Sequence, residues 1–246
     1  MKYMGSKARI ADELLSVMLP YRTSNAQAFV EPFCGGCAVI EKVSGRRIAS
    51  DKNKYLVAML KHLSEVGVND LPKVIERDYY SDVRDSYNRK DGRYPDYRIG
   101  WVAFMGSFNG RDFSGGYAGH HVEIKGGKFR DYIGENIRNT LEQIPRLKGI
   151  NFIEGGIDYY DLEIPPYSLI YCDPPYAGTK QYSTSKNFVY ERFYEWCRKM
   201  SADGHTVFVS EYNMPPDFKC VWDKQLSTTI NQTITKKPVE KLFTIS

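Results

Sequence analysis

A glycine loop between two short apolar segments constrains the fold of this chain more than any other feature. Residues 28–30 (AFV) lead into residues 31–37 (EPFCGGC), a helical stretch begins at residues 38–40, and residues 46–50 form a second strand that ends at Asp51. This order of strand, glycine loop, helix, strand and acidic residue is typical of open parallel sheets that hold nucleotide-like cofactors. Glycines also occur in such turns for packing alone, and that alternative stays open for the loop taken by itself.

A second motif follows the apolar segment of residues 168–172 (SLIYC). Asp173, Pro174, Pro175 and Tyr176 bring a carboxylate, a carbonyl oxygen and an aromatic face together where the predicted strand ends. The prolines fix φ and remove an N–H donor, so the turn is rigid and its carbonyl can accept a hydrogen bond from a ligand. Two acceptors beside a flat ring suit the exocyclic amine of a nucleic-acid base.

The composition permits a folded α/β protein that binds a polyanion. The chain has 246 residues, 42% of them apolar, enough for one sizeable core with a large insertion or a small second domain. The net charge is +4, and 34 lysines and arginines can supply a local phosphate-binding face. Apolar runs are far too short to cross a membrane and no signal peptide opens the chain, so we expect a cytoplasmic location and no membrane partner.

Five cysteines are scattered along the chain, and their odd number favours reduced thiols. Only Cys34 and Cys37 form a CxxC pair, which could serve redox chemistry or half of a zinc site. A structural zinc site normally needs four ligands, and the chain has no second closely spaced pair. We therefore expect no metal and interpret the pair as part of the glycine loop.

The middle of the chain changes character and is interpreted as an inserted module. Residues 53–87 are mostly helical in pattern, whereas residues 91–133 are rich in glycine, aromatic and basic residues with little periodicity. Asparagine and arginine on such a turn-rich frame can reach base edges, and lysines can contact phosphate. The alternative is a solvated surface loop whose aromatic residues dock on the core. The candidate DNA-binding residues are Asn109, Arg111, Lys125, Lys128 and Arg130.

The remaining segments predict further strands and helices around these motifs. A helix starts near Ser6 and ends at Pro20, and residues 151–154 form a strand that is soon followed by Asp158. The polar segment 178–186 suits a mobile lid. The other expected elements are a helix over residues 187–200, a strand over 205–210, and a terminal hairpin built around 218–222 and 239–243.

Several segments, in this order, resemble the motifs of one enzyme family. Residues 2–7 (KYMGSK) are similar to a KWxGGK-like segment in which Tyr3 replaces Trp, residues 29–36 to an FVEPFxGxG cofactor loop, and residues 173–176 (DPPY) to an unchanged catalytic motif. Residues 108–111 resemble the start of a DNA-reading hairpin region. By these motifs the chain resembles, over nearly its whole length, the Dam-type DNA adenine methyltransferases of the alpha group.

The resemblance implies a fold and a division of the chain. The expected fold is a Rossmann-like class I methyltransferase sheet of α/β type, with an inserted, mainly helical and hairpin target-recognition module. Residues 1–55 and 146–246 would form a discontinuous catalytic domain that binds S-adenosylmethionine. Residues 56–145 would form the DNA-binding module.

The resemblance also implies roles for individual residues. Asp173, Pro174 and Tyr176 would be catalytic. Plain alternatives remain for two cofactor residues, since Lys7 can be a solvated charge and Asp51 can be the cap of the following helix. The residues expected to contact S-adenosylmethionine are Tyr3, Lys7, Phe33, Gly35, Asp51, Asp158 and Asp173.

The implied reaction is methyl transfer from S-adenosylmethionine to the N6 amine of an adenine flipped out of double-stranded DNA. The enzyme would act as a monomer in a bacterial or phage-infected cell, without a metal. The same acceptors and ring would serve N4 methylation of cytosine or methylation of RNA. A catalytically silent module that binds cofactor or DNA is a further alternative, as is a nucleotide-dependent oxidoreductase, although the loop lacks a GxGxxG pattern.

Overall fold

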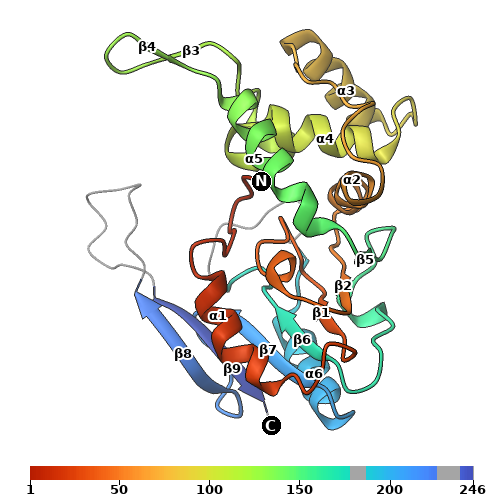
Figure 1. The fold of residues 1–246 in the computed structure, drawn as a ribbon, viewed down its shortest axis with the longest axis vertical. Coiled ribbons are helices and arrows are strands. Elements are labelled where there is room, and N and C mark those ends of the chain that lie inside the picture. Colours follow the sequence, from red (N-terminus) through yellow and green to blue (C-terminus); the bar gives the residue numbers. More distant parts are fainter. Residues whose placement is uncertain (178–186, 226–238, 246) are drawn as a thin grey trace.

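A computed structural model describes residues 1–177, 187–225 and 239–245. Its centre is a seven-stranded sheet with the strand order β5-β2-β1-β6-β7-β9-β8 (Figure 1). The five strands from β5 to β7 are parallel, and β9 and β8 continue the sheet in antiparallel pairing. The strands of this sheet are β1 (Phe29–Glu31), β2 (Arg47–Ala49), β5 (Ile150–Phe152), β6 (Leu169–Cys172), β7 (Thr206–Glu211), β8 (Lys219–Gln225) and β9 (Val239–Ile245). The predicted α/β fold with a parallel sheet and a terminal hairpin is confirmed.

Alternate side chains of the strands enter two separate hydrophobic clusters, because successive residues of a strand point to opposite faces. Phe29, Leu169 and Phe208 join the cluster on one face. Val30 and Ile170 join the cluster on the other. Both faces of the central strands are therefore buried, which explains their continuous apolar sequence.

One helix from each end of the chain packs with one of these clusters. α1 (Ala11–Met18) contributes Leu14 and Met18 to the first cluster, and α6 (Tyr190–Ala202) contributes Phe193 and Trp196 to the second. The first helix was expected to start near Ser6, but α1 begins at Ala11, so that prediction is wrong. The side chain of Ser6 accepts a hydrogen bond from the Ala8 amide at 3.3 Å, but this turn precedes the helix and does not cap it.

The chain between β2 and β5 forms a group of helices beside the sheet, with one projecting hairpin (Figure 1). Asn53 caps the first of these helices, since its side chain accepts hydrogen bonds from the amides of Tyr55 and Leu56. Short 3-10 turns elsewhere are η1 (Leu19–Tyr21), η2 (Ile40–Lys42) and η5 (Tyr159–Asp161). The elements of the group are α2 (Lys54–Glu65), α3 (Arg77–Arg89), α4 (Asp96–Gly106), η3 (Phe108–Gly110), η4 (Asp112–Gly115), β3 (Val122–Ile124), β4 (Lys128–Arg130) and α5 (Tyr132–Leu147).

Two expectations for this part of the chain are wrong. The helical stretch expected from residue 38 is only the single turn η2, which ends before Val43. The segment expected to be mostly irregular contains α4, in which the eight residues from Ile99 to Gly106 are buried. A helix that is covered on all sides shows no apolar stripe, so its periodicity is invisible in the sequence.

The parallel strands bring the ends of β1, β2, β5, β6 and β7 to one edge of the sheet, which we call the carboxyl edge. The glycine loop follows β1, Asp51 follows β2, Asp158 follows β5 and Asp173 follows β6. Open α/β sheets bind their ligands outside this edge. The predicted lid at residues 178–186 lies outside the described residues. Within those residues, none of the helices combines the length and the apolar character that a membrane span requires.

Candidate active site

The turn after β6 meets the start of the chain through an ion pair. Lys7 Nζ lies 2.9 Å from Asp173 Oδ1 and donates to the Gly5 carbonyl at 3.3 Å. The Lys7 side chain is only 9% exposed. The alternative that Lys7 is a solvated surface charge is therefore wrong. Burial opposes its charged form, but the carboxylates of Asp173 and Glu240 outweigh this effect and raise the pKa of Lys7. The ammonium group is therefore held in place as a cation beside Asp173.

Asp173 is the carboxylate of this pair and the first residue of the DPPY turn. Burial raises the pKa of Asp173 above its ordinary value, and the adjacent Lys7 ammonium acts in the opposite direction. Pro174, the next residue of the turn, is buried. Its packing holds the backbone that carries the Asp173 carboxylate and the Pro174 carbonyl. The turn thus presents a carboxylate and a carbonyl on a rigid frame.

The ring of Tyr176 is contacted on several sides. Its hydroxyl donates to Glu240 Oε2 at 2.7 Å. The Tyr212 ring meets it edge to face, with centroids 4.7 Å apart and planes at 85°. Lys7 Nζ lies 4.7 Å from the centroid of the Tyr176 ring, within the range of a cation–π contact. A ring held by such contacts is preorganised to stack on a planar partner.

Glu211 ends β7 and is only 1% exposed. Its Oε2 accepts from the Ala177 amide at 3.0 Å, and its Oε1 accepts from the Tyr212 amide at 2.6 Å. Burial raises the pKa of Glu211 from 4.5 to about 7, although both hydrogen bonds oppose the rise. Since Ala177 directly follows the DPPY turn, Glu211 ties the exit of the turn to the neighbouring strand.

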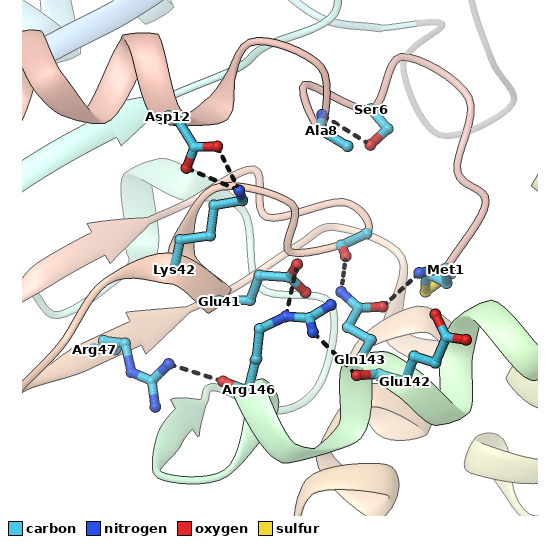
Figure 2. A network of polar contacts seen from close by, with 11 residues as sticks. Met1, Ser6, Ala8, Asp12, Glu41, Lys42, Arg47, Glu142, Gln143 and Arg146 are labelled. Carbon is cyan, nitrogen blue, oxygen red and sulfur yellow. Dashed lines mark hydrogen bonds and ion pairs between the residues drawn. The ribbon is translucent and has the colours of Figure 1, made fainter.

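Tyr3 covers the glycine loop, and the two glycines make room for it. A Cβ atom at Gly35 would lie 2.7 Å from Tyr3 Cε1, and one at Gly36 would lie 2.8 Å from Tyr3 Cβ. Gly35 also has a φ of +46°, a conformation that side-chain-bearing residues rarely adopt. The carbonyl of Gly36 accepts from Gln143 of α5 at 2.8 Å, and Figure 2 shows Gln143 between this loop and Met1. The start of the chain and α5 thus both pack on the glycine loop.

Asp51 binds the glycine loop directly. Its Oδ2 accepts from the Gly35 amide at 3.0 Å and its Oδ1 accepts from the Asn53 amide at 2.9 Å. Because Asn53 caps α2, Asp51 does not act as the cap. Burial raises the pKa of Asp51. Each carboxylate oxygen keeps a further lone pair, so Asp51 can still accept from a ligand hydroxyl.

Phe33 and Asp158 lie at the same edge, next to η5. The Phe33 ring packs on the Tyr159 ring with centroids 5.3 Å apart, within an aromatic cluster that also contains Phe188 and Phe193. Asp158 accepts from the Tyr159 amide at 3.0 Å, and its Oδ2 lies 2.9 Å from Lys52 Nζ. An apolar ring beside a carboxylate is a setting that suits a purine with an exocyclic amine.

The predicted DNA-binding residues are all exposed, but they fall into two places. Asn109 and Arg111 flank Gly110, whose Cβ would lie 2.2 Å from the Lys2 carbonyl oxygen, so this segment packs on the start of the chain. Arg111 Nε lies 2.9 Å from Met4 Sδ. These two residues are therefore next to the segment that carries Tyr3 and Lys7.

Lys125, Lys128 and Arg130 belong to the β3–β4 hairpin, which projects from the body of the molecule (Figure 1). Arg130 is tied to α5, because its guanidinium donates to both oxygens of Glu135 at 2.7 and 2.8 Å. Its guanidinium also lies 4.7 Å from the centroid of the Tyr132 ring. Within the described ranges 1–177, 187–225 and 239–245, the side chains of Lys125 and Lys128 form no hydrogen bond or ion pair.

Sequence reasoning missed Glu211, Glu240 and Gln143. Glu211 had a signal, because it follows directly from a predicted strand at the carboxyl edge, as Asp51 and Asp173 do. Glu240 and Gln143 had none, since they reach the site through strand pairing and helix packing.

Among the described residues no group of three or more metal-binding side chains occurs. Cys34 and Cys37 are both buried in the glycine loop, where hydrogen bonding to Cys37 and burial raise the pKa of Cys34.

The sequence of this chain is similar to those of known proteins. Residues 3–213 match the family model of the D12 class N6 adenine-specific DNA methyltransferases. The type II methyltransferase M.MjaIII of Methanocaldococcus jannaschii is 24% identical over an alignment of 257 residues that covers 87% of this chain and 84% of that protein.

A weaker structural similarity exists with the crystal structure of SMU.472 complexed with SAH. The TM-score is 0.38 at 11% sequence identity, and the match covers 98% of this chain and 53% of that one. This chain thus spans about half the length of that protein.

Proposed function

Because the chain belongs to the D12 class N6 adenine-specific DNA methyltransferases, we propose that its DPPY turn methylates an adenine flipped out of double-stranded DNA. Methyl transfer to the N6 amine of adenine in DNA, with S-adenosylmethionine as donor, is the activity of the family. The family resemblance inferred from the sequence motifs is thereby confirmed. What the structure adds is a candidate role for each side chain at the carboxyl edge.

The observation that carries the proposal is the joint placement of Lys7, Asp173 and Tyr176. The adenine amine is a poor nucleophile because its lone pair is delocalised into the ring. Two acceptors, the Asp173 carboxylate and the Pro174 carbonyl, hold its two N–H groups and favour a pyramidal nitrogen. Lys7 lies 2.9 Å from Asp173 and favours the carboxylate form that accepts these hydrogen bonds.

Tyr176 would receive the base by stacking. An adenine inside a duplex is inaccessible to a reagent held in a protein pocket, so it must be extruded from the stack. Stacking on an aromatic side chain replaces part of the stacking energy that the base loses, roughly 1–3 kcal/mol per base. Since no covalent intermediate is needed, alignment of the amine with the methyl donor supplies much of the acceleration.

The residues at the carboxyl edge fit the cofactor. Asp51 suits ribose hydroxyls, Phe33 and Asp158 suit the adenine ring, and Tyr3 and Gly35 would line the remainder of the ligand. One buried oxygen of Glu31, at the end of β1, has no hydrogen-bond partner within the described residues, and such an acceptor suits a cationic ligand group. When bound, S-adenosylmethionine supplies a methyl group activated by its sulfonium centre.

We assign DNA contacts to residues 56–145 and keep the catalytic part as residues 1–55 and 146–246. Asn109 and Arg111 lie beside the segment that carries Tyr3 and Lys7, which suits contacts to the bases around the extruded adenine. Lys125 and Lys128 suit phosphate contacts at a distance from it, and Arg130 would join them at the hairpin base. A monomer in the cytoplasm of a bacterial or phage-infected cell is sufficient for this activity.

The test is to incubate the full chain with isotopically labelled S-adenosylmethionine and unmethylated double-stranded DNA, then digest the DNA and identify the nucleosides by mass spectrometry. Labelled N6-methyladenine is expected. Labelled N4-methylcytosine would keep the acceptors and the ring but reject the adenine assignment. Label in RNA and not in DNA, in a parallel reaction, would reject DNA as the substrate.

A further inference from the structure

Glu240 lies at the catalytic turn although it comes from the last strand of the sheet. It is separated from Tyr176 by 64 residues in the sequence, and its Oε2 accepts from the Tyr176 hydroxyl at 2.7 Å. The same oxygen lies 3.9 Å from Lys7 Nζ. Glu240 is 9% exposed. This buried carboxylate contacts Tyr176, which is assigned to catalysis, and Lys7, which forms the ion pair with Asp173.

Strand pairing explains how Glu240 reaches this position. β9 runs antiparallel to β7, with Lys241 opposite Glu211 and Leu242 opposite Ser210. Glu240 therefore lies one residue beyond the end of β7, at the carboxyl edge. It shares a face of β9 with Leu242, whose buried side chain belongs to the core cluster that contains Tyr171. The hydrophobic packing of β9 thus fixes where the carboxylate of Glu240 lies.

The Tyr176 side chain is held at its ring and at its hydroxyl. The edge of Tyr212 and the Lys7 ammonium contact the ring, and Glu240 accepts from the hydroxyl. The hydrogen bond to the Glu240 carboxylate restrains the hydroxyl end, because it anchors the atom farthest from the backbone. A ring that must stack on an extruded base needs a fixed position, since small misplacements cost rate.

Glu240 also shares Lys7 with Asp173. The ammonium lies 2.9 Å from Asp173 and 3.9 Å from Glu240, and both carboxylates contribute to the raised pKa of Lys7. The two carboxylates hold the cation between the catalytic aspartate and the stacking ring. One residue therefore supports both groups that meet the substrate.

We propose that Glu240 is a positioning residue for methyl transfer, which anchors the hydroxyl end of Tyr176 and places Lys7 beside Asp173. This inference rests on the proposed function and extends it to the terminal strand. Glu240 does not touch the reacting atoms, so its removal alters the rate of the chemical step more than the affinity for DNA or cofactor.

The test is a double-mutant cycle on the full chain with Glu240→Ala and Tyr176→Phe. Single-turnover formation of N6-methyladenine is measured with saturating S-adenosylmethionine and unmethylated plasmid DNA, and both dissociation constants are measured in parallel. We expect each single variant to be about 10- to 100-fold slower, with both dissociation constants within about threefold of the parent. The double variant is expected to lose less rate than the product of the two single losses, because both changes break the same hydrogen bond.

Two further variants separate positioning from loss of folding. Glu240→Gln keeps an acceptor oxygen for the Tyr176 hydroxyl and is expected to recover most of the lost rate. Glu195→Ala, an exposed glutamate on α6, is the matched control and is expected to react at the parent rate. If Glu240→Ala does not fold, the methylation rates of Tyr176→Phe and Glu240→Gln still test the proposal.

Parent-level rates for Tyr176→Phe or Glu240→Ala would overturn the proposal, and so would losses that multiply in the double variant. A Glu240→Gln variant as slow as Glu240→Ala would also overturn the role of the hydrogen bond. Failure of the proposed function is distinguishable, because then the parent chain itself forms no methylated adenine, and both proposals fall together.

Discussion

The carboxyl edge of the sheet and the β3–β4 hairpin both carry ionisable residues, but they hold them in opposite ways. At the carboxyl edge, Lys7, Glu211 and Glu240 are each less than 10% exposed and each has a defined partner within a few ångströms. On the hairpin, Lys125 and Lys128 are exposed and, within the described part of the chain, have no ion-pair partner.

This difference separates two physical tasks. A buried charge costs solvation free energy and is kept only where partners hold it, which gives the fixed geometry that a chemical step needs. An exposed, unpaired cation keeps its hydration and can exchange it for phosphate, which gives affinity without fixed geometry. We therefore assign chemistry to the carboxyl edge and DNA attraction to the hairpin.

The largest effect is expected from Asp173→Ala. It removes one acceptor for the amine and leaves Lys7 without its nearest anion, so the single-turnover rate should fall by roughly 10²- to 10⁴-fold. DNA affinity should stay close to that of the parent. The measurement is labelled N6-methyladenine against time, and Asp161→Ala, an exposed aspartate on η5, is the matched control. A rate near that of the parent would exclude Asp173 from catalysis.

The next largest effect is expected from the double variant Lys125→Ala/Lys128→Ala. Loss of two phosphate contacts should weaken DNA binding and reduce the slope of log affinity against log salt by about 2. The methylation rate at saturating DNA should be unchanged. The control is Lys148→Ala/Lys219→Ala, two exposed lysines outside residues 56–145. An unchanged salt slope would remove the hairpin from the DNA interface.

Arg111→Ala is expected to have a smaller effect, because its guanidinium lies against Met4 beside the catalytic segment. If Arg111 contacts bases, its loss should cost about 1–3 kcal/mol of binding and relax the sequence preference. The measurements are DNA affinity and sequencing of methylated sites. Loss of S-adenosylmethionine affinity with normal DNA affinity would place Arg111 on the cofactor side of the division.

The smallest expected effect concerns pH and Glu211. The pKa of Glu211 is raised to about 7 in the folded protein, so the folded state favours the protonated form. The stability that this gives is fully present below about pH 4.5 and is lost as the pH rises through about 7. Glu211→Gln should therefore lose less thermal stability than the parent between pH 5 and pH 8. Thermal unfolding at both pH values, with Glu163→Gln as an exposed control, measures this difference, and equal losses would contradict it.

The sequence predicted those parts of the fold and site that follow from local order. The strand before Asp173, the strand before Asp51 and the glycine loop are contiguous segments, and a parallel sheet necessarily brings their carboxyl ends to one edge. That rule places Asp51, Asp158 and Asp173 at one edge without any knowledge of packing.

The parts that were missed depend on contacts between distant segments. Glu240 reaches Tyr176 only through the pairing of β9 with β7, and Gln143 reaches the glycine loop only through the packing of α5. α4 was missed because a helix buried on every side has no apolar stripe. The position of Arg111 on Met4 depends on Gly110, whose missing side chain lets two distant backbones meet.

The measurement that tests the division most directly compares Asp173→Ala with Lys125→Ala/Lys128→Ala on the same DNA. For each protein, the single-turnover methylation rate at saturating DNA and the DNA dissociation constant are determined side by side. We predict that Asp173→Ala loses the rate and keeps the affinity, while the hairpin variant loses affinity and keeps the rate. If both variants lose both quantities, or if the two losses are exchanged, the assignment of chemistry to the carboxyl edge and of DNA attraction to the hairpin is contradicted.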